Sequence, residues 1–94
     1  MWVVRYTIDK NYGFKVFEKK PDAELLYNQL ARAAAQQHIV RTLQGTRVYI
    51  DEADLFYAPT APDPWAARKA VQQDQAILVE HSPWEIDVES VFID

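Results

Sequence analysis

Residues 2–18 read WVVRYTIDKNYGFKVFE, and apolar and polar side chains alternate along them. Aromatic and branched residues recur with a period of two from Trp2 to Ile8, which is typical of a β-strand with one buried face. A turn is predicted at residues 9–13, because this polar run ends in Gly13, which can take a positive φ. The chain then returns as a second strand, so the stretch predicts an N-terminal β-hairpin.

The second face of this hairpin carries polar side chains and is predicted to meet solvent. Basic residues interleaved with aromatic ones can also bind single-stranded nucleic acid by charge and stacking. This face therefore offers an alternative function, a small nucleic-acid-binding module. Its candidate binding residues are Arg5, Lys15 and Lys19.

Two helices are predicted after the hairpin. Pro21 suits the first turn of a helix that ends near Gln37. Asp63 followed by Pro64 is a helix start, and that helix is expected to reach about Gln73. The apolar spacing predicts a buried stripe on the first helix. This stripe consists of Ala23, Leu26, Leu30, Ala33 and Gln37.

Residues 39–50 admit two interpretations. One is a second hairpin around Gln44 and Gly45, with Ile39 opposite Ile50. The other continues the first helix to Leu43 and uses Gly45 as its C-terminal stop. The sequence leaves both open.

The remaining segments complete an α+β pattern. Residues 51–54 are predicted to be a polar turn, residues 76–80 a buried strand, and residues 84–89 a strand with one apolar and one acidic face. We therefore expect one domain over residues 1–94: a mainly antiparallel sheet of two to three hairpins, with two helices packed on one face.

Two short stretches of the chain have similar sequences. Residues 5–9 read RYTID and residues 47–51 read RVYID, an offset of 42 residues. A duplicated strand–turn–strand–helix unit would produce such a match. Chance similarity between short stretches is the favoured interpretation, because short matches have a high false-positive rate. A true repeat would require a hairpin over residues 46–57 and a longer first helix.

Charge is divided unevenly between the two halves of the chain. Residues 1–47 contain eight of the ten Lys and Arg and four of the fourteen Asp and Glu, a net charge of +4. Residues 48–94 have a net charge of −8, and no Lys or Arg follows Lys69. Such asymmetry predicts an acidic surface that faces a basic partner. The overall charge of −4 argues against a dedicated nucleic-acid binder.

Two groups of carboxylates are the candidate docking residues for such a partner. The first is the acidic face of the last predicted strand, and the second is the polar turn. These residues are Glu85, Asp87 and Glu89, and Asp51, Glu52 and Asp54. We therefore predict a non-catalytic protein-binding module, an inhibitor or adaptor that docks on a basic surface of a nucleic-acid-handling protein. The small size, the acidic charge and the absence of cysteine fit antagonists of nucleic-acid-binding machinery, including those made by phages and other mobile elements.

Enzymatic and metal-binding patterns are weak in this sequence. The chain has no cysteine, which excludes disulfides and thiolate chemistry. His81 beside Ser82 lacks a glycine-flanked nucleophile elbow, and His38 lies at a predicted helix end. The carboxylates at residues 51–54 do not have calcium-loop spacing. The sequence therefore predicts no enzyme, no cofactor and no metal site.

The cellular location is predicted from two features that the sequence lacks. The first residues lack the pattern of a signal peptide, and no apolar stretch approaches the length that spans a bilayer. We expect a cytoplasmic protein with no membrane partner. A homo-oligomer is a further alternative, because the apolar tail at residues 91–93 could cover a partner's strand edge.

Overall fold

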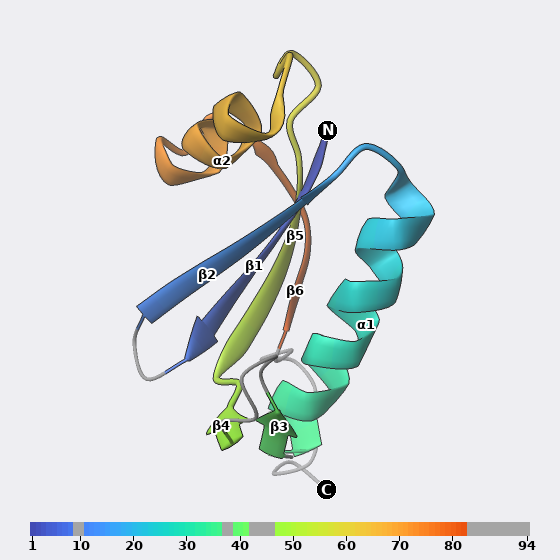
Figure 1. Ribbon diagram of the computed structural model, residues 1–94, viewed down its shortest axis with the longest axis vertical. Coiled ribbons are helices and arrows are strands. Elements are labelled where there is room, and N and C mark those ends of the chain that lie inside the picture. The colour runs from blue at the N-terminus through green and yellow to red at the C-terminus, as the bar shows by residue number, and fades with distance from the viewer. Residues whose placement is uncertain (9–10, 37–38, 42–46, 83–94) are drawn as a thin grey trace, which may run out of the picture.

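The computed structural model describes residues 1–8, 11–36, 39–41 and 47–82. These residues form six strands and two helices (Figure 1). In chain order they are β1 (Trp2–Ile8), β2 (Asn11–Phe17), α1 (Lys20–Gln36), β3 (Ile39–Arg41), β4 (Arg47–Tyr49), β5 (Glu52–Tyr57), α2 (Pro64–Gln72) and β6 (Ile77–Ser82).

Four of the strands form one antiparallel sheet in the order β2-β1-β5-β6. β1 and β5 are the central strands, although 49 residues separate Arg5 from its cross-strand neighbour Asp54. β3 and β4 form a separate two-stranded ladder. The predicted α+β class, with an antiparallel sheet and two helices, is confirmed.

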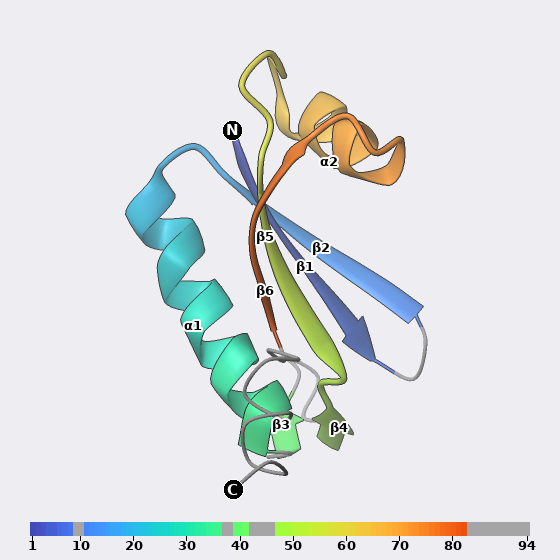
Figure 2. The same ribbon diagram turned by 180° about the vertical axis from the view of Figure 1, so that it is seen from behind.

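The two helices lie on opposite faces of the sheet, not on one face as predicted (Figures 1 and 2). Val4 and Leu55 pack in one cluster with α1, whereas Val3 and Phe56 pack in a second cluster with α2. Consecutive strand residues point to opposite faces, so both faces of β1 and β5 are buried. The prediction was wrong because the second face of the N-terminal hairpin, which includes Val3, was expected to meet solvent.

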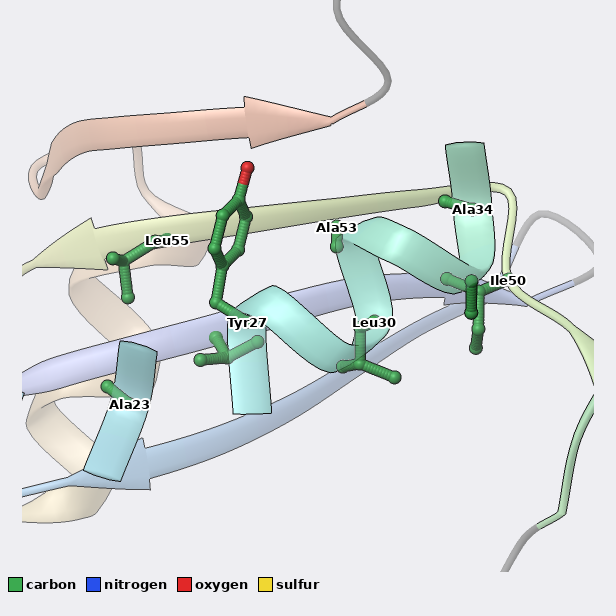
Figure 3. Packing of buried hydrophobic residues seen from close by; sticks show 9 residues of the cluster. Ala23, Tyr27, Leu30, Ala34, Ile50, Ala53 and Leu55 are labelled. Carbon is green, nitrogen blue, oxygen red and sulfur yellow. The ribbon is translucent and has the colours of Figure 1, made fainter. Parts of the chain in front are cut away.

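The longer helix, α1, lies along the whole of one face. Its buried side chains include Tyr27, which the predicted stripe omitted, and Leu30 (Figure 3). They pack on Val4 and Leu55 of the central strands. The helix ends at Gln36, one residue before the predicted end. Tyr27 lies four residues after Ala23 and so shares its side of the helix, which the spacing could have shown.

Residues 39–50 contain the hairpin and not the continued helix. Ile39 pairs with Tyr49 and Arg41 with Arg47, so the register differs by one residue from the predicted pairing of Ile39 with Ile50. β4 pairs with β3 and not with β5. The hairpin over residues 46–57 that a true repeat would require is therefore absent from the described residues, which favours the chance-match interpretation.

Residues after this hairpin depart from two further predictions. Glu52–Tyr57 is a central strand, so Asp54 is not in a turn. β6 lies at the sheet edge among the described strands, and its residues Ile77, Leu78 and Val79 are exposed and not buried. An apolar run looks the same whether it is central or at an edge, because neighbouring strands alone decide its burial. The strand predicted at residues 84–89 lies outside the described residues.

Gly13 has a different role from the one predicted. It lies within β2, opposite Tyr6 of β1. The Tyr6 ring occupies the space that a Cβ at position 13 would need. A larger residue at this position would displace the Tyr6 ring, so glycine allows the ring to lie across the neighbouring strand.

The core can be tested with two leucines that differ in burial. Leu55 is 1% exposed and Leu25 is 64% exposed. Leu55→Ala should lower the free energy of unfolding by about 2–5 kcal/mol, because it leaves a cavity between α1 and the sheet. Leu25→Ala should change it by less than about 0.5 kcal/mol. Urea denaturation measures both, and equal effects would contradict the described packing.

Candidate functional site

Three charged or titratable side chains form a row across the middle of the sheet. Arg5 of β1 lies opposite Asp54 of β5, and Asp54 lies opposite His81 of β6. Directly opposed residues on antiparallel strands share a face, and here it is the α2 face, which also carries Val3 and Phe56. Strand register alone therefore brings together residues far apart in the sequence.

The Arg5 guanidinium is held on several sides. Its Nε and Nη2 donate to Oδ2 of Asp54 at 3.0 and 2.9 Å. Its Cζ lies 4.9 Å from the ring centroid of Tyr12 and 4.8 Å from that of Phe56, within the range of cation–π contact. Asp54 is 2% exposed, so its charge is stabilised inside the sheet by Arg5 and not by water.

His81 completes the row from the edge strand. Its Nδ1 lies within hydrogen-bonding distance of Oδ1 of Asp54, and its side chain is 39% exposed. A carboxylate in this position orients the imidazole. Ser82, the nucleophile imagined from the sequence, points to the other face, where its Oγ donates to the Ala31 carbonyl at 3.3 Å. The structure therefore does not bring the His81 and Ser82 side chains together.

Tyr27 is the titratable group most perturbed by the fold. It lies on the α1 side, where its hydroxyl points toward the β6 side of the sheet (Figure 3) and has no hydrogen-bond partner among the described residues. Burial, followed by the nearby charges of Glu80 and Asp54, raises the pKa of Tyr27 from 10.0 to about 12. The neutral phenol is favoured because ionisation would place an unsolvated charge beside two carboxylates.

The β6 edge is the most apolar exposed strand of the described sheet. Ile77, Leu78 and Val79 are 56%, 54% and 41% exposed. Val79 is the extra residue of a β-bulge, because Leu55 pairs with Glu80 and Phe56 with Leu78. β5 covers one side of this strand, and no described strand pairs with the other.

The predicted docking carboxylates fall in different environments. Asp51 and Glu52 are exposed at the start of β5, whereas Asp54 is buried and paired. These three side chains therefore do not form one exposed cluster. Glu85, Asp87 and Glu89 lie outside the described residues, as does His38.

The predicted basic residues of the hairpin are also separated. Arg5 is on the α2 face, whereas Lys15 lies opposite Val4 and lines a hollow on the α1 side with Asp22 and Leu25. Lys19 is exposed in the connection between β2 and α1. Period-two alternation does not tell which residue of β2 opposes which residue of β1, so the sequence could not reveal this separation.

A group that the sequence prediction missed lies on α2. Trp65 is 70% exposed, and the Lys69 Nζ lies 4.7 Å from the centroid of its ring. The spacing of Trp65, Arg68 and Lys69 at positions i, i+3 and i+4 was a usable signal, since it places the three side chains on one helix face. It was overlooked because the sequence led us to expect Trp65 on an apolar helix face with Ala66, Ala70 and Val71.

No group of three or more His, Asp or Glu side chains that could hold a metal ion occurs among residues 1–8, 11–36, 39–41 and 47–82. Neither described helix is long and apolar enough to cross a membrane. No protein family, curated protein or solved structure matches this chain.

Removing the buried carboxylate tests the network. Asp54→Ala leaves the Arg5 charge without its partner, so the free energy of unfolding should fall by about 3 kcal/mol. Asp51→Ala removes an equal charge from an exposed position and should cost less than about 0.5 kcal/mol. Chemical denaturation of both variants is the measurement. A loss as small for Asp54 as for Asp51 would show that the ion pair contributes nothing.

The buried phenol predicts a specific loss of stability in alkali. Above pH 10 the unfolded chain releases the Tyr27 proton while the folded chain retains it until about pH 12. Stability should be complete below pH 10 and decline by about 2 kcal/mol between pH 10 and 12. Tyr27→Phe should remove this part of the decline, and Tyr12→Phe at an exposed position should not. Denaturation midpoints at pH 8 and pH 11 distinguish them, and identical pH profiles for the two variants would refute it.

Proposed function

We propose that this protein is a non-catalytic protein-binding module, an adaptor or inhibitor that pairs its β6 edge with an extended segment of a basic partner. The observation that carries the proposal is the exposed apolar edge formed by Ile77, Leu78 and Val79. The proposed partner handles nucleic acids, because such proteins present surfaces rich in Lys and Arg.

Backbone geometry supports strand addition at this edge. An edge strand offers N–H and C=O groups that an extended peptide can bind, and side-chain pockets then provide specificity. Natural edges are usually protected by charged residues, especially lysine, or by proline. β6 instead places three branched aliphatic side chains at the start of its edge, and their exposure disfavours the isolated state.

Charge supports a basic partner. Glu80 lies within β6, and the carboxylates of Glu85, Asp87 and Glu89 follow it in the sequence with no Lys or Arg between them. Asp51 and Glu52, at the start of the neighbouring strand β5, are exposed. Complementary charge accelerates association and makes it sensitive to salt.

Affinity capture with matched variants tests the proposal. The tagged protein is incubated with nuclease-treated lysate, washed at low and then high salt, and its captured proteins are identified by mass spectrometry. Leu78→Lys changes the edge, and reversal of Glu85, Asp87 and Glu89 to Lys changes the acidic segment. Leu25→Lys is the control, because it introduces the same side chain at an exposed position of α1.

We expect one basic protein that is released by salt, is lost with both test variants and is retained with the control. Its purified form should associate several-fold more slowly with the charge-reversed variant. Retention by Leu78→Lys would exclude the β6 edge as the binding surface. A dimer in light scattering that Leu78→Lys dissociates would instead show that a second copy covers the edge.

A further inference from the structure

Aromatic and cationic side chains gather on α2 and on the neighbouring strand β2, at the opposite edge of the described sheet from β6. Arg68 of α2 lies over Phe14 of β2, with its Cζ 4.8 Å from the ring centroid. The centroids of the Phe14 and Tyr12 rings are 6.5 Å apart. Arg5 ends this row, because its guanidinium lies over the Tyr12 ring. We call this surface the cation–ring face. It consists of Tyr12, Phe14, Trp65, Arg68 and Lys69.

Two rings of the cation–ring face are largely open to solvent. Trp65 is 70% exposed and Tyr12 is 57% exposed. Large aromatic side chains are usually buried, so two exposed rings indicate a binding surface. Arg68 links them, because it lies over Phe14 and also lines a hollow beside Trp65. One side of the Trp65 ring contacts Lys69, and the exposed area remains available to a planar ligand.

The exposed face of α2 also has a hollow of about 440 Å³, lined by Trp65, Arg68, Lys69, Gln72 and Gln73. Ligand sites typically measure roughly 300–1,000 Å³. The side chains around it supply a stacking surface, two cations, and amides that both donate and accept hydrogen bonds. This combination suits a planar base joined to a phosphate.

The local helix geometry holds this group in place. Asp63 caps the start of α2 by accepting from the Ala66 N–H at 2.8 Å. At the other end Asp74 adopts a φ of 60°, and the Gln75 N–H donates to the Ala70 carbonyl at 2.8 Å. Both ends of the short helix are thus capped. The buried residues Ala67 and Val71 pack it on the sheet.

The two cations on α2 are available to a ligand. Within the described parts of the chain, neither Arg68 nor Lys69 forms an ion pair, and both are exposed. The charge of Arg5 differs, because Asp54 already pairs with it. Arg5 therefore supports the Tyr12 ring. The charges of this face that can meet an anionic ligand are those of Arg68 and Lys69.

We propose that the cation–ring face binds single-stranded nucleic acid, with bases stacked on Trp65 and Tyr12 and phosphates beside Arg68 and Lys69. Rings can stack only on bases that are not already paired within a duplex, which selects single strands. This site goes beyond the protein-binding function, since it uses β2 and α2 and leaves the β6 edge free.

Fluorescence anisotropy with a labelled oligothymidylate of about ten nucleotides tests the site. We expect binding at low salt, with quenching of tryptophan emission. Trp65→Ala should weaken binding about tenfold, and Trp65→Phe should retain most of it. Because Trp65 is exposed, its replacement leaves the fold intact, which circular dichroism can verify.

Salt dependence distinguishes the proposed cations from general charge. With two phosphates neutralised, the logarithm of the association constant should fall with the logarithm of salt concentration with a slope of about −1.4. Arg68→Ala or Lys69→Ala should each reduce this slope by about 0.7. Lys15→Ala is the matched control, because it removes the same charge from the α1 side.

Three results would overturn the proposal. The first is no binding of the oligonucleotide at low salt. The second is an equal loss of affinity for Lys15→Ala and Lys69→Ala, which would indicate unspecific attraction. The third is a polyglutamate peptide of the same length that binds as tightly and depends equally on Trp65, which would make this an acidic-peptide site.

Discussion

Burial of β1 and β5 on both faces is the constraint on which the rest of this fold depends. Val3 and Val4 are fully buried on opposite sides, and Leu55 and Phe56 repeat the pattern on the neighbouring strand. A strand in this position needs a layer on each side, which α1 and α2 provide. Each helix is amphipathic and short of apolar surface, so neither would be stable without the sheet.

The same constraint explains why one ion pair lies in the sheet interior. Asp54 occupies a position of β5 that no water solvates, and a buried carboxylate is tolerated only when cations and hydrogen-bond donors satisfy it. Arg5 does so from one neighbouring strand, and His81 lies beside it on the other. A slip of one residue in either ladder would turn these side chains to opposite faces. The row thus favours the observed register over its neighbours.

The two proposed binding surfaces lie away from the central strands β1 and β5. β6 and β2 are the two edges of the described sheet, and they differ in chemistry. The β6 edge is aliphatic and precedes an acidic segment, whereas the β2 edge and α2 present rings and cations. The two edges have opposite charge, which is consistent with the uneven distribution of charged residues along the chain. The last basic residues of the sequence lie on α2. The two proposed binding surfaces therefore lie at opposite edges of the described sheet.

Local sequence was sufficient to predict most of the individual elements. The alternation from Trp2 to Ile8, the proline at position 21 and the Asp63–Pro64 start each act over a few residues. Their strand and helices accordingly lie within one or two residues of the predicted bounds. Residues 39–50 stayed ambiguous because a hairpin and a continued helix satisfy similar local preferences, and the pairing of Ile39 with Tyr49 decided between them.

Sequence by itself determined the α+β class, the two helix starts and the uneven charge, because spacing, capping chemistry and composition are local properties. Tertiary structure alone decided which strands are central, which face each helix covers and which charged residues are buried. Asp54 and Asp51 look alike in sequence, yet one is inside the sheet and the other is in solvent. That difference arises from pairing between strands about 50 residues apart, and no local pattern encodes it.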